Sequence, residues 1–287
     1  MSPDATAAEA PPAVSVLIPA CNEEACINGC LDALFASDPL PGGATGEVLV
    51  LANGCTDATA DVSRAVKPPA GWRLRVLEQA DSGKPNALNA GDQAARGRVL
   101  VYLDADVRVE PALIPLIAAA LAGTAPRYAS GRPVVAPAQS ALTRAYARAW
   151  RRLPFFAQPA PGFGLFAMNR SGRARWGEWP DIISDDTFAR LQFRADERLE
   201  VPARYAWPMV EGFRNQVRVR RRQDKGVAEI AALYPELLAN DSKARASPAE
   251  LFRRLAADPA ASLVYLLVAL AVKSPLFASR DIWTRGR

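Results

Sequence analysis

The chain of 287 residues contains no histidine at all. This absence excludes a Ser-His-Asp or Cys-His catalytic site, a His-ligated zinc ion and a histidine general base. Any acid–base or metal chemistry must therefore depend on Asp, Glu, Cys, Tyr or Lys side chains.

Cysteine is scarce as well, with four residues that form no CxxC pair: Cys21, Cys26, Cys30 and Cys55. No apolar leader precedes them, because residues 1–13 are acidic and are expected to form a loose tail. We interpret the cysteines as free thiols of a protein in a reducing cytosol, packed mainly in the core.

Long hydrophobic runs are also missing. The apolar run Leu263–Val272 has ten residues, about half of what a membrane-spanning helix needs. It predicts either a helix buried against the protein or one lying at a membrane interface. Four arginines fall near one face of the helix predicted at 139–153: Arg144, Arg148, Arg151 and Arg152. They form either a solvated surface or a contact for lipid headgroups or a phosphorylated acceptor. Together these features predict peripheral association with an anionic membrane on its cytoplasmic face.

Half of the residues are hydrophobic and 23% are charged, which is typical of a globular protein and excludes a mainly disordered chain. The net charge of +5 is mild and suits a phosphorylated ligand, an anionic membrane or nothing specific. Nucleic acid is not expected as a partner, because the basic residues are not interleaved with aromatic residues on which bases stack.

The first 125 residues alternate between short apolar strands and amphipathic helices. Strands are predicted at 14–18, 47–51, 73–77 and 99–103, and helices at 23–37, 57–66, 84–95 and 111–121. Such strands are buried on both faces, which predicts a parallel sheet with helices on each side. Ligands of such sheets bind beyond the carboxyl ends of the strands. Residues 126–226 are less regular, with a strand at 162–168 and helices at 139–153 and 185–193, and a further helix is predicted at 250–257.

Two carboxylates, Asp104 and Asp106, directly follow the predicted strand at 99–103. An extended backbone places residues i and i+2 on the same side, where two acids repel each other unless a cation lies between them. Oxygen ligands suit Mg²⁺ or Mn²⁺, and a nucleoside diphosphate would complete the coordination. The alternative is that one aspartate caps a turn and the other is only solvated.

A second acidic pair, Asp185 and Asp186, precedes an apolar helical stretch. Acids in a first helical turn can serve simply as caps. In a chain without histidine, a carboxylate with a raised pKa is also the natural general base for a hydroxyl proton.

Five segments in order resemble the family 2 glycosyltransferases with the GT-A fold. They are VSVLIPACNEE, VLANGCTDATA, GKPNALNAG, YLDADV and IISDDTF, and the resemblance covers Val14–Gly226. It implies a GT-A-type fold with a mostly parallel central sheet and helices on both faces, and the helical patterns beyond residue 226 predict a C-terminal helical extension. We expect domain boundaries at 14–226, divided into a nucleotide-binding half (14–125) and an acceptor-binding half (126–226), with the extension at 227–287.

The resemblance also implies roles for single residues. Pro19, Cys21 and Glu23 would line the base and ribose pocket, and Asn53 and Asp57 would shape the second nucleotide loop. Lys84 would approach the diphosphate, Asp104 would face the ribose and cation, and Asp106 would ligate Mn²⁺ or Mg²⁺. Asp186 would be the catalytic base, with Asp185 beside it. The implied reaction is inverting transfer from a nucleoside-diphosphate sugar to a hydroxyl of a sugar or lipid-linked glycan.

Two further groups of residues are open to two interpretations each. The basic segment 214–225, with Arg218 and Arg221, is either a solvated helix face or a cover over the diphosphate. Trp176 and Trp179 either stack on an acceptor sugar or pack a loop.

The chain departs from the family pattern at two points. Ala52 and Asn53 stand where many relatives carry two acids, and no QxxRW motif of processive synthases is present, which predicts a non-processive enzyme. Two alternatives are a sugar nucleotidyltransferase and a non-catalytic nucleotide-sugar-binding module. The first is disfavoured because PACNEE, not a glycine-rich basic loop, follows the first strand.

Overall fold

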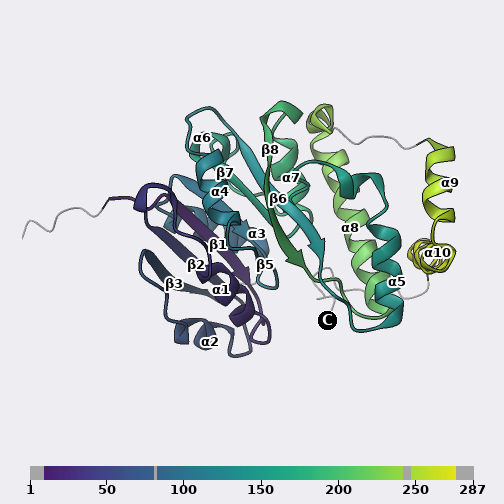
Figure 1. Cartoon of the computed structure of the whole chain (residues 1–287), viewed down its shortest axis with the longest axis horizontal. Coiled ribbons are helices and arrows are strands. Elements are labelled where there is room, and N and C mark those ends of the chain that lie inside the picture. Colours follow the sequence, from purple (N-terminus) through teal and green to yellow (C-terminus); the bar gives the residue numbers. More distant parts are fainter. Residues whose placement is uncertain (1–9, 81–82, 242–246, 276–287) are drawn as a thin grey trace, which may run out of the picture.

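The structure is a computed structural model that describes residues 10–80, 83–241 and 247–275 (Figure 1). Residues 1–9 of the predicted tail lie outside the described residues. The strands are β1 (Val14–Ala20), β2 (Gly46–Asn53), β3 (Trp72–Gln79), β4 (Val99–Leu103), β5 (Arg108–Val109), β6 (Tyr128–Val135), β7 (Leu165–Asn169) and β8 (Arg198–Trp207). The α-helices are α1 (Ile27–Phe35), α2 (Thr59–Ala65), α3 (Lys84–Ala94), α4 (Leu113–Ala120), α5 (Ala141–Trp150), α6 (Arg170–Arg173), α7 (Asp185–Leu191), α8 (Phe213–Leu233), α9 (Pro248–Ala256) and α10 (Pro259–Lys273). Short 3₁₀ turns are η1 (Pro41–Gly43), η2 (Pro154–Ala157), η3 (Ala195–Glu197) and η4 (Pro235–Asn240).

One eight-stranded sheet runs through both halves of the chain, in the order β3-β2-β1-β4-β7-β6-β8-β5. The first four strands are mutually parallel, so their carboxyl ends meet at one edge. Beyond β4 both directions occur. β7 is antiparallel to both β4 and β6, while β8 is parallel to β6 and antiparallel to β5. The sheet is therefore mixed, with its parallel part where the sequence predicts it.

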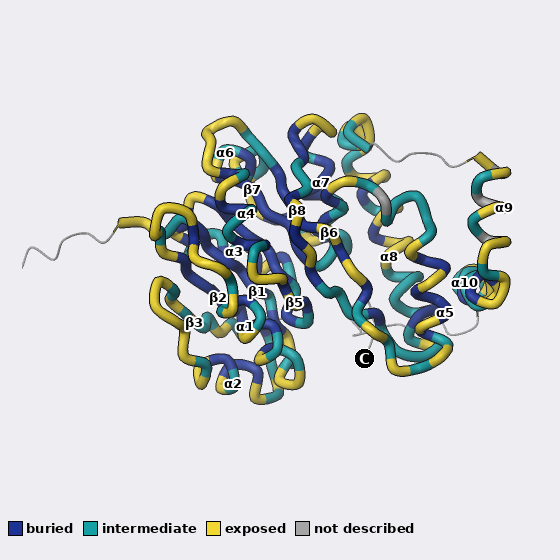
Figure 2. The backbone as a smooth tube through the Cα atoms, viewed as in Figure 1, coloured by how far each residue is buried: buried dark blue, intermediate teal, exposed yellow. Residues whose placement is uncertain are grey.

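The central strands are buried on both faces, as their apolar sequences predict (Figure 2). On one face, Val16 and Ile18 of β1 belong to a core cluster with residues of α1 and α4. On the other face, Leu17 belongs to a cluster with residues of α3 and α7. Successive side chains of a strand point to opposite faces, so one short apolar strand contributes to both cores.

A third core cluster joins the helices of the second half. Trp150 of α5 is its centre, with ring centroids 4.7 Å from Phe155 and 5.4 Å from both Phe163 and Trp207. Helix α10 packs on α5 and α8, and lies with α9 at the end of the molecule farthest from β3 (Figure 1). Within the described ranges, no helix combines the length and the apolar character needed to cross a membrane.

The structure corrects several predicted boundaries. Helix α1 begins at Ile27 and not at Glu23, and α8 runs through the expected boundary between residues 226 and 227. The basic segment 214–225 is thus part of a continuous helix of 21 residues. The sequence pattern does not predict strands β6 and β8. Both contain a proline, and their exposed positions interrupt the apolar pattern.

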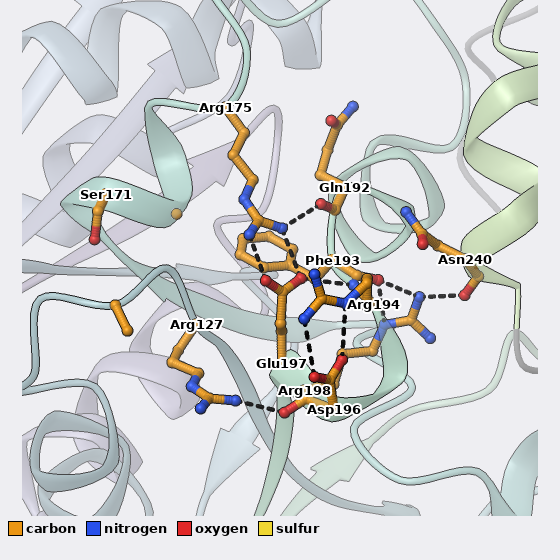
Figure 3. Close-up of polar contacts among 12 residues, drawn as sticks. Arg127, Ser171, Arg175, Gln192, Phe193, Arg194, Asp196, Glu197, Arg198 and Asn240 are labelled. Carbon is orange, nitrogen blue, oxygen red and sulfur yellow. Dashed lines mark hydrogen bonds and ion pairs between the residues drawn. The ribbon is translucent and has the colours of Figure 1, made fainter.

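A network of arginines fixes the C-terminal end of α7 (Figure 3). Arg175 forms a two-pronged ion pair with Glu197 at 2.6 and 2.9 Å and donates to the carbonyl oxygen of Gln192. Arg198 donates to the carbonyl oxygens of Phe193 and Asn240. The hydrogen bonds from Arg175 lower the pKa of Glu197 to about 2. The helix that begins with the acidic pair is therefore anchored at its opposite end.

Candidate functional site

The loops that follow β1 and β2 are tied together by side chains of both. Asn22, whose φ of 54° lies in the left-handed region, accepts hydrogen bonds from the backbone and hydroxyl of Thr56. Asp57 accepts from the backbone N–H of Glu24 at 3.2 Å and from that of Thr59 at 3.0 Å. Glu23 donates its N–H to the hydroxyl of Thr59 and Glu24 donates to Asp57, so the turn before α1 is held against the loop after β2 and the start of α2.

A cavity of about 450 Å³ opens at the carboxyl edge of the parallel strands, and we call it the larger cavity. The ends of β1, β2 and β4 line it together with the start of α3 and one arginine of α8: Pro19, Ala20, Cys21, Glu23, Asn53, Gly83, Lys84, Ala87, Asp104, Ala105, Asp106 and Arg222. Its volume is within the range of small-molecule sites. Of the residues assigned to the nucleotide by sequence, Asp57 does not line it and instead holds the two loops together.

A smaller cavity of about 170 Å³ shares Pro19, Lys84, Asp104 and Arg222 with the larger one, so the two are neighbours. Its other walls are Asp185 and Asp186 with the preceding Ile183 and Ser184, the aromatic residues Tyr102, Phe163, Phe166 and Trp207, and Leu103, Gly164, Val219 and Gln223. Gly164 has φ 76°, and a Cβ there would lie 2.6 Å from the ring of Trp207. Only glycine fits this wall without displacing the tryptophan.

Lys84 connects the two acidic pairs. Its Nζ lies 3.0 Å from a carboxylate oxygen of Asp104 and 3.0 Å from one of Asp185. Burial opposes the charge of Lys84, but the two carboxylates outweigh it and the pKa is raised above its ordinary value. Burial raises the pKa of Asp185; Lys84 offsets this only in part, and the like charges of Asp186 and Asp104 add to the rise. The site thus holds a permanent cation between two acids.

The acidic pair at the start of α7 divides into two environments. Asp185 is buried, whereas Asp186 is half-buried on the wall of the smaller cavity. The loop before α7 is fixed by Glu229 of α8, which accepts from the N–H of Ile183 at 2.8 Å. Gly226 lets α8 approach this loop closely, since a Cβ there would lie 2.4 Å from Oγ of Ser184.

Asp104 and Asp106 are the candidate metal ligands. Both line the larger cavity, and the backbone of Asp104 is fixed by the N–H bond to Gly164 O at 2.9 Å. In the part of the chain that the structure describes, no three His, Cys, Asp or Glu side chains cluster as a metal site. Two carboxylates completed by substrate phosphates are a common Mg²⁺ arrangement, so the donor set fits a cation bound together with a nucleotide.

The two tryptophans predicted for the acceptor lie elsewhere. Trp179 is 3% exposed, and its Nε1 donates to Asp92 at 2.8 Å. Trp176 packs edge-on against Trp179 and Phe188, under the guanidinium of Arg173. Neither ring lines the two cavities. Burial therefore favours the loop-packing interpretation over stacking on a sugar.

Neither of the predicted arginines, Arg218 and Arg221, lines the two cavities. Arg221 donates to the carbonyl oxygens of Ala271, Val272 and Ser274 and so holds the end of α10, while Arg218 donates to Asn215. Arg222 is the arginine that lines both cavities. The sequence does contain a pattern that singles out Arg222. It lies one helical turn before Gly226, a small residue that allows close packing, so both residues lie on the packed face of α8.

Solved structures share this architecture. Mannosyltransferase PcManGT from Pyrobaculum calidifontis, in complex with GDP-Man and Mn²⁺, is 24% identical with a TM-score of 0.56, over 93% of this chain and 82% of that one. Glucosyl-3-phosphoglycerate synthase from Mycobacterium tuberculosis, with Mn²⁺, UDP and glucosyl-3-phosphoglycerate, is 23% identical with a TM-score of 0.53, over 77% and 79%. These likenesses establish the GT-A fold.

Curated sequences match over a shorter stretch. The PGL/p-HBAD biosynthesis glycosyltransferase of Mycobacterium tuberculosis is 32% identical over 97 residues, which are 34% of this chain and 36% of that protein. Dolichyl-phosphate beta-glucosyltransferase of Drosophila melanogaster is 36% identical over 99 residues, 32% of this chain and 30% of that protein. The matched stretch thus spans about a third of each relative's length. The sequence model described as "Glycosyl transferase family 2" matches residues 15–200, well over half of the chain. The chain therefore belongs to glycosyl transferase family 2.

Proposed function

We propose that this protein transfers a glycosyl group from a nucleoside-diphosphate sugar to an acceptor hydroxyl, with inversion at the anomeric carbon. The observation that carries the proposal is the pair of neighbouring cavities that share Lys84, Asp104 and Arg222. One cavity has the residues for a diphosphate and a cation, and the other has the residues for a proton acceptor. A donor lying across both would place its anomeric carbon between them.

The nucleotide belongs in the larger cavity under this proposal. Cys21, Glu23 and Asn53 would face the base and ribose, as the family resemblance implies. Lys84 and Arg222 would donate hydrogen bonds to the diphosphate and stabilise the charge that develops as it leaves. These two cations come from different elements, α3 and α8, so the diphosphate would be held from two sides.

A divalent cation fits beside the diphosphate. Asp104 and Asp106 would hold Mn²⁺ or Mg²⁺, and the ion would supply Lewis-acid neutralisation of the leaving diphosphate. Two of the solved neighbours carry Mn²⁺ together with a nucleotide or nucleotide sugar, which supports this assignment. Lys84 would then remain paired with Asp185, its second carboxylate partner.

The proton acceptor is Asp186. The acceptor oxygen forms the new bond to the anomeric carbon while the bond from that carbon to the diphosphate oxygen breaks, and Asp186 takes the hydroxyl proton. A single in-line displacement with one base inverts the anomeric configuration. Asp185 is less suited to this role, because it is buried and already paired with Lys84. The aromatic wall of Tyr102, Phe166 and Trp207 offers an apolar face for the sugar ring.

The test compares Asp186→Asn with Asp185→Asn. A screen of nucleotide sugars with Mn²⁺ first identifies the donor by its rise in melting temperature. Asp186→Asn should keep donor binding and lose transfer at least about a hundredfold, the lower range of general-base catalysis. Asp185→Asn should lose less. The anomeric configuration of the product, read by NMR, tests inversion.

Three results would contradict the proposal. Near-normal turnover of Asp186→Asn with an inactive Asp185→Asn would move the base by one residue. Full activity of both variants would place the base elsewhere. Donor binding without transfer to any sugar or lipid-linked hydroxyl acceptor would favour the non-catalytic binding module.

A further inference from the structure

Helix α10 presents a row of exposed leucines on its outer face. Leu263, Leu266, Leu267 and Leu270 are 57, 46, 48 and 66% exposed. Their spacing of three and four residues aligns them along one side of the helix. Most surface leucines stand alone, whereas these four form one continuous apolar stripe, which we call the leucine face.

The opposite side of α10 is held firmly on the protein. Tyr265 stacks on Tyr146 of α5 at 5.7 Å between ring centroids, and Val268 is fully buried. The C-terminal carbonyls accept from Arg221, and Asp258 caps the N-terminus by accepting from the N–H of Ala261. The helix therefore cannot turn to bury its leucines without breaking these contacts.

Basic residues outnumber acidic residues in α10 and in two of the helices near it. The segments 141–152 and 247–275 contain α5, α9 and α10 and carry seven basic and two acidic residues: Arg144, Arg148, Arg151, Arg152, Arg253, Arg254 and Lys273 against Glu250 and Asp258. Arg148 and Arg152 reach Asp258 at one end of α10, and the exposed Lys273 lies at the other.

From this combination we infer that the leucine face of α10 docks on the surface of an anionic lipid bilayer. A helix with an apolar face flanked by basic residues lies in the plane of the interface, where the leucines enter the acyl boundary and the cations meet the headgroups. The 15 residues of α10 span about 22 Å, less than the roughly 30 Å of a bilayer core, which suits lying on the membrane and not crossing it. This inference goes beyond the proposed transfer reaction and does not depend on it.

The experiment is flotation of the full chain with lipid vesicles. We expect binding to phosphatidylcholine vesicles that contain about 30% phosphatidylglycerol, weak binding to phosphatidylcholine alone, and release as salt rises from about 0.05 to about 0.5 M. The double variant Leu266→Ser, Leu270→Ser should lower the binding constant at least about tenfold, since each leucine transfers its side chain out of water. Both positions are exposed, so circular dichroism should show an unchanged fold.

The matched control is Leu233→Ser, Leu238→Ser, which removes two exposed leucines of α8 and η4, outside the leucine face. The control should bind vesicles like the unmodified chain. Three outcomes would overturn the inference: no vesicle binding at low salt, equal loss in both double variants, or a dimer in sedimentation velocity that only Leu266→Ser, Leu270→Ser dissociates. The last would make the face a contact between two copies of this chain.

Discussion

Replacing Lys84 by methionine tests how the two acidic pairs are held together. Methionine keeps the length and apolar stem of lysine but removes the cation that lies 3.0 Å from both Asp104 and Asp185. The lysine side chain is 23% exposed and that of Asp185 is 9% exposed, so water replaces the lost cation poorly at Asp185. Asp104, at 37%, is open enough for water to solvate it.

The magnitude follows from this asymmetry. Removing one partner of a buried ion pair typically costs 3–5 kcal/mol, and because only one of the two carboxylates is deeply buried we expect about 3 kcal/mol at pH 8. Without Lys84, the folded-state pKa of Asp185 lies further above its unfolded value. An acid with a raised folded pKa loses stability as pH rises through that pKa, so the cost should shrink toward pH 5. The double variant Lys84→Met, Asp185→Asn should recover more than half of the loss.

The assay is urea unfolding at pH 5 and pH 8 in the presence of a chelator, which keeps the site in one metal-free state. Lys225→Met on the exposed side of α8 is the control and should stay within about 0.5 kcal/mol of the unmodified chain. The reasoning is refuted if Lys84→Met is as stable as the control, or if Asp185→Asn gives no recovery in the double variant.

Three other predictions concern the cation, the diphosphate and acid stability. Asp106→Asn should abolish the Mn²⁺-dependent part of donor binding while leaving the melting temperature of the free protein unchanged; equal donor titrations with and without chelator in the unmodified chain would contradict it. Arg222→Gln should weaken donor binding by about 10- to 100-fold, which is the contribution of a hydrogen bond between charged groups. Arg221→Gln should leave donor affinity intact and lower the stability of the fold by releasing the end of α10. Calorimetric titration of the donor into each variant measures the two affinities. Because Arg175 lowers the pKa of Glu197 to about 2, the stability this carboxylate contributes is present above its unfolded pKa near 4.5 and is lost as pH falls from there toward 2. Glu197→Gln should therefore cost up to about 3 kcal/mol at pH 7 and flatten the acid limb of a stability profile, and an unchanged profile would be the contrary result.

The nucleotide-binding half was readable from the sequence because its elements are local and apolar. β4 begins and ends where predicted, at Val99 and Leu103, since a strand buried on both faces must be apolar throughout. The sequence pattern does not predict β8 because Pro202 and Arg204 stand on its exposed positions, and because its pairing with β6 and β5 depends on partners about 70 to 100 residues away. A local sequence pattern does not show which distant strand will pair with a segment.

The site residues, too, could be predicted where local sequence determines their position, and not where distant contacts do. Asp104, Asp106 and Lys84 lie at ends of elements that the sequence fixes in order, and the structure brings them to one cavity. The two interpretations left open concern residues whose neighbours are distant in sequence. Trp179 packs in a core cluster with residues of α3 and α7, and Asp92 of α3 accepts from its indole N–H. Arg221 and Arg222 differ by the side of α8 on which each lies. The sequence shows a cluster of arginines but not which side of the helix faces the cavity.

The reversal of strand direction beyond β4 has a consequence for synthesis on the ribosome. β1 to β4 can pair as soon as residue 103 is available, but the other edge of β4 waits for β7, about 60 residues later. At 5–20 residues per second this takes about 3 to 12 seconds, during which five apolar residues form an open strand edge. A nascent chain is therefore most prone to join another during this interval, and a truncated chain ending between β4 and β7 should aggregate.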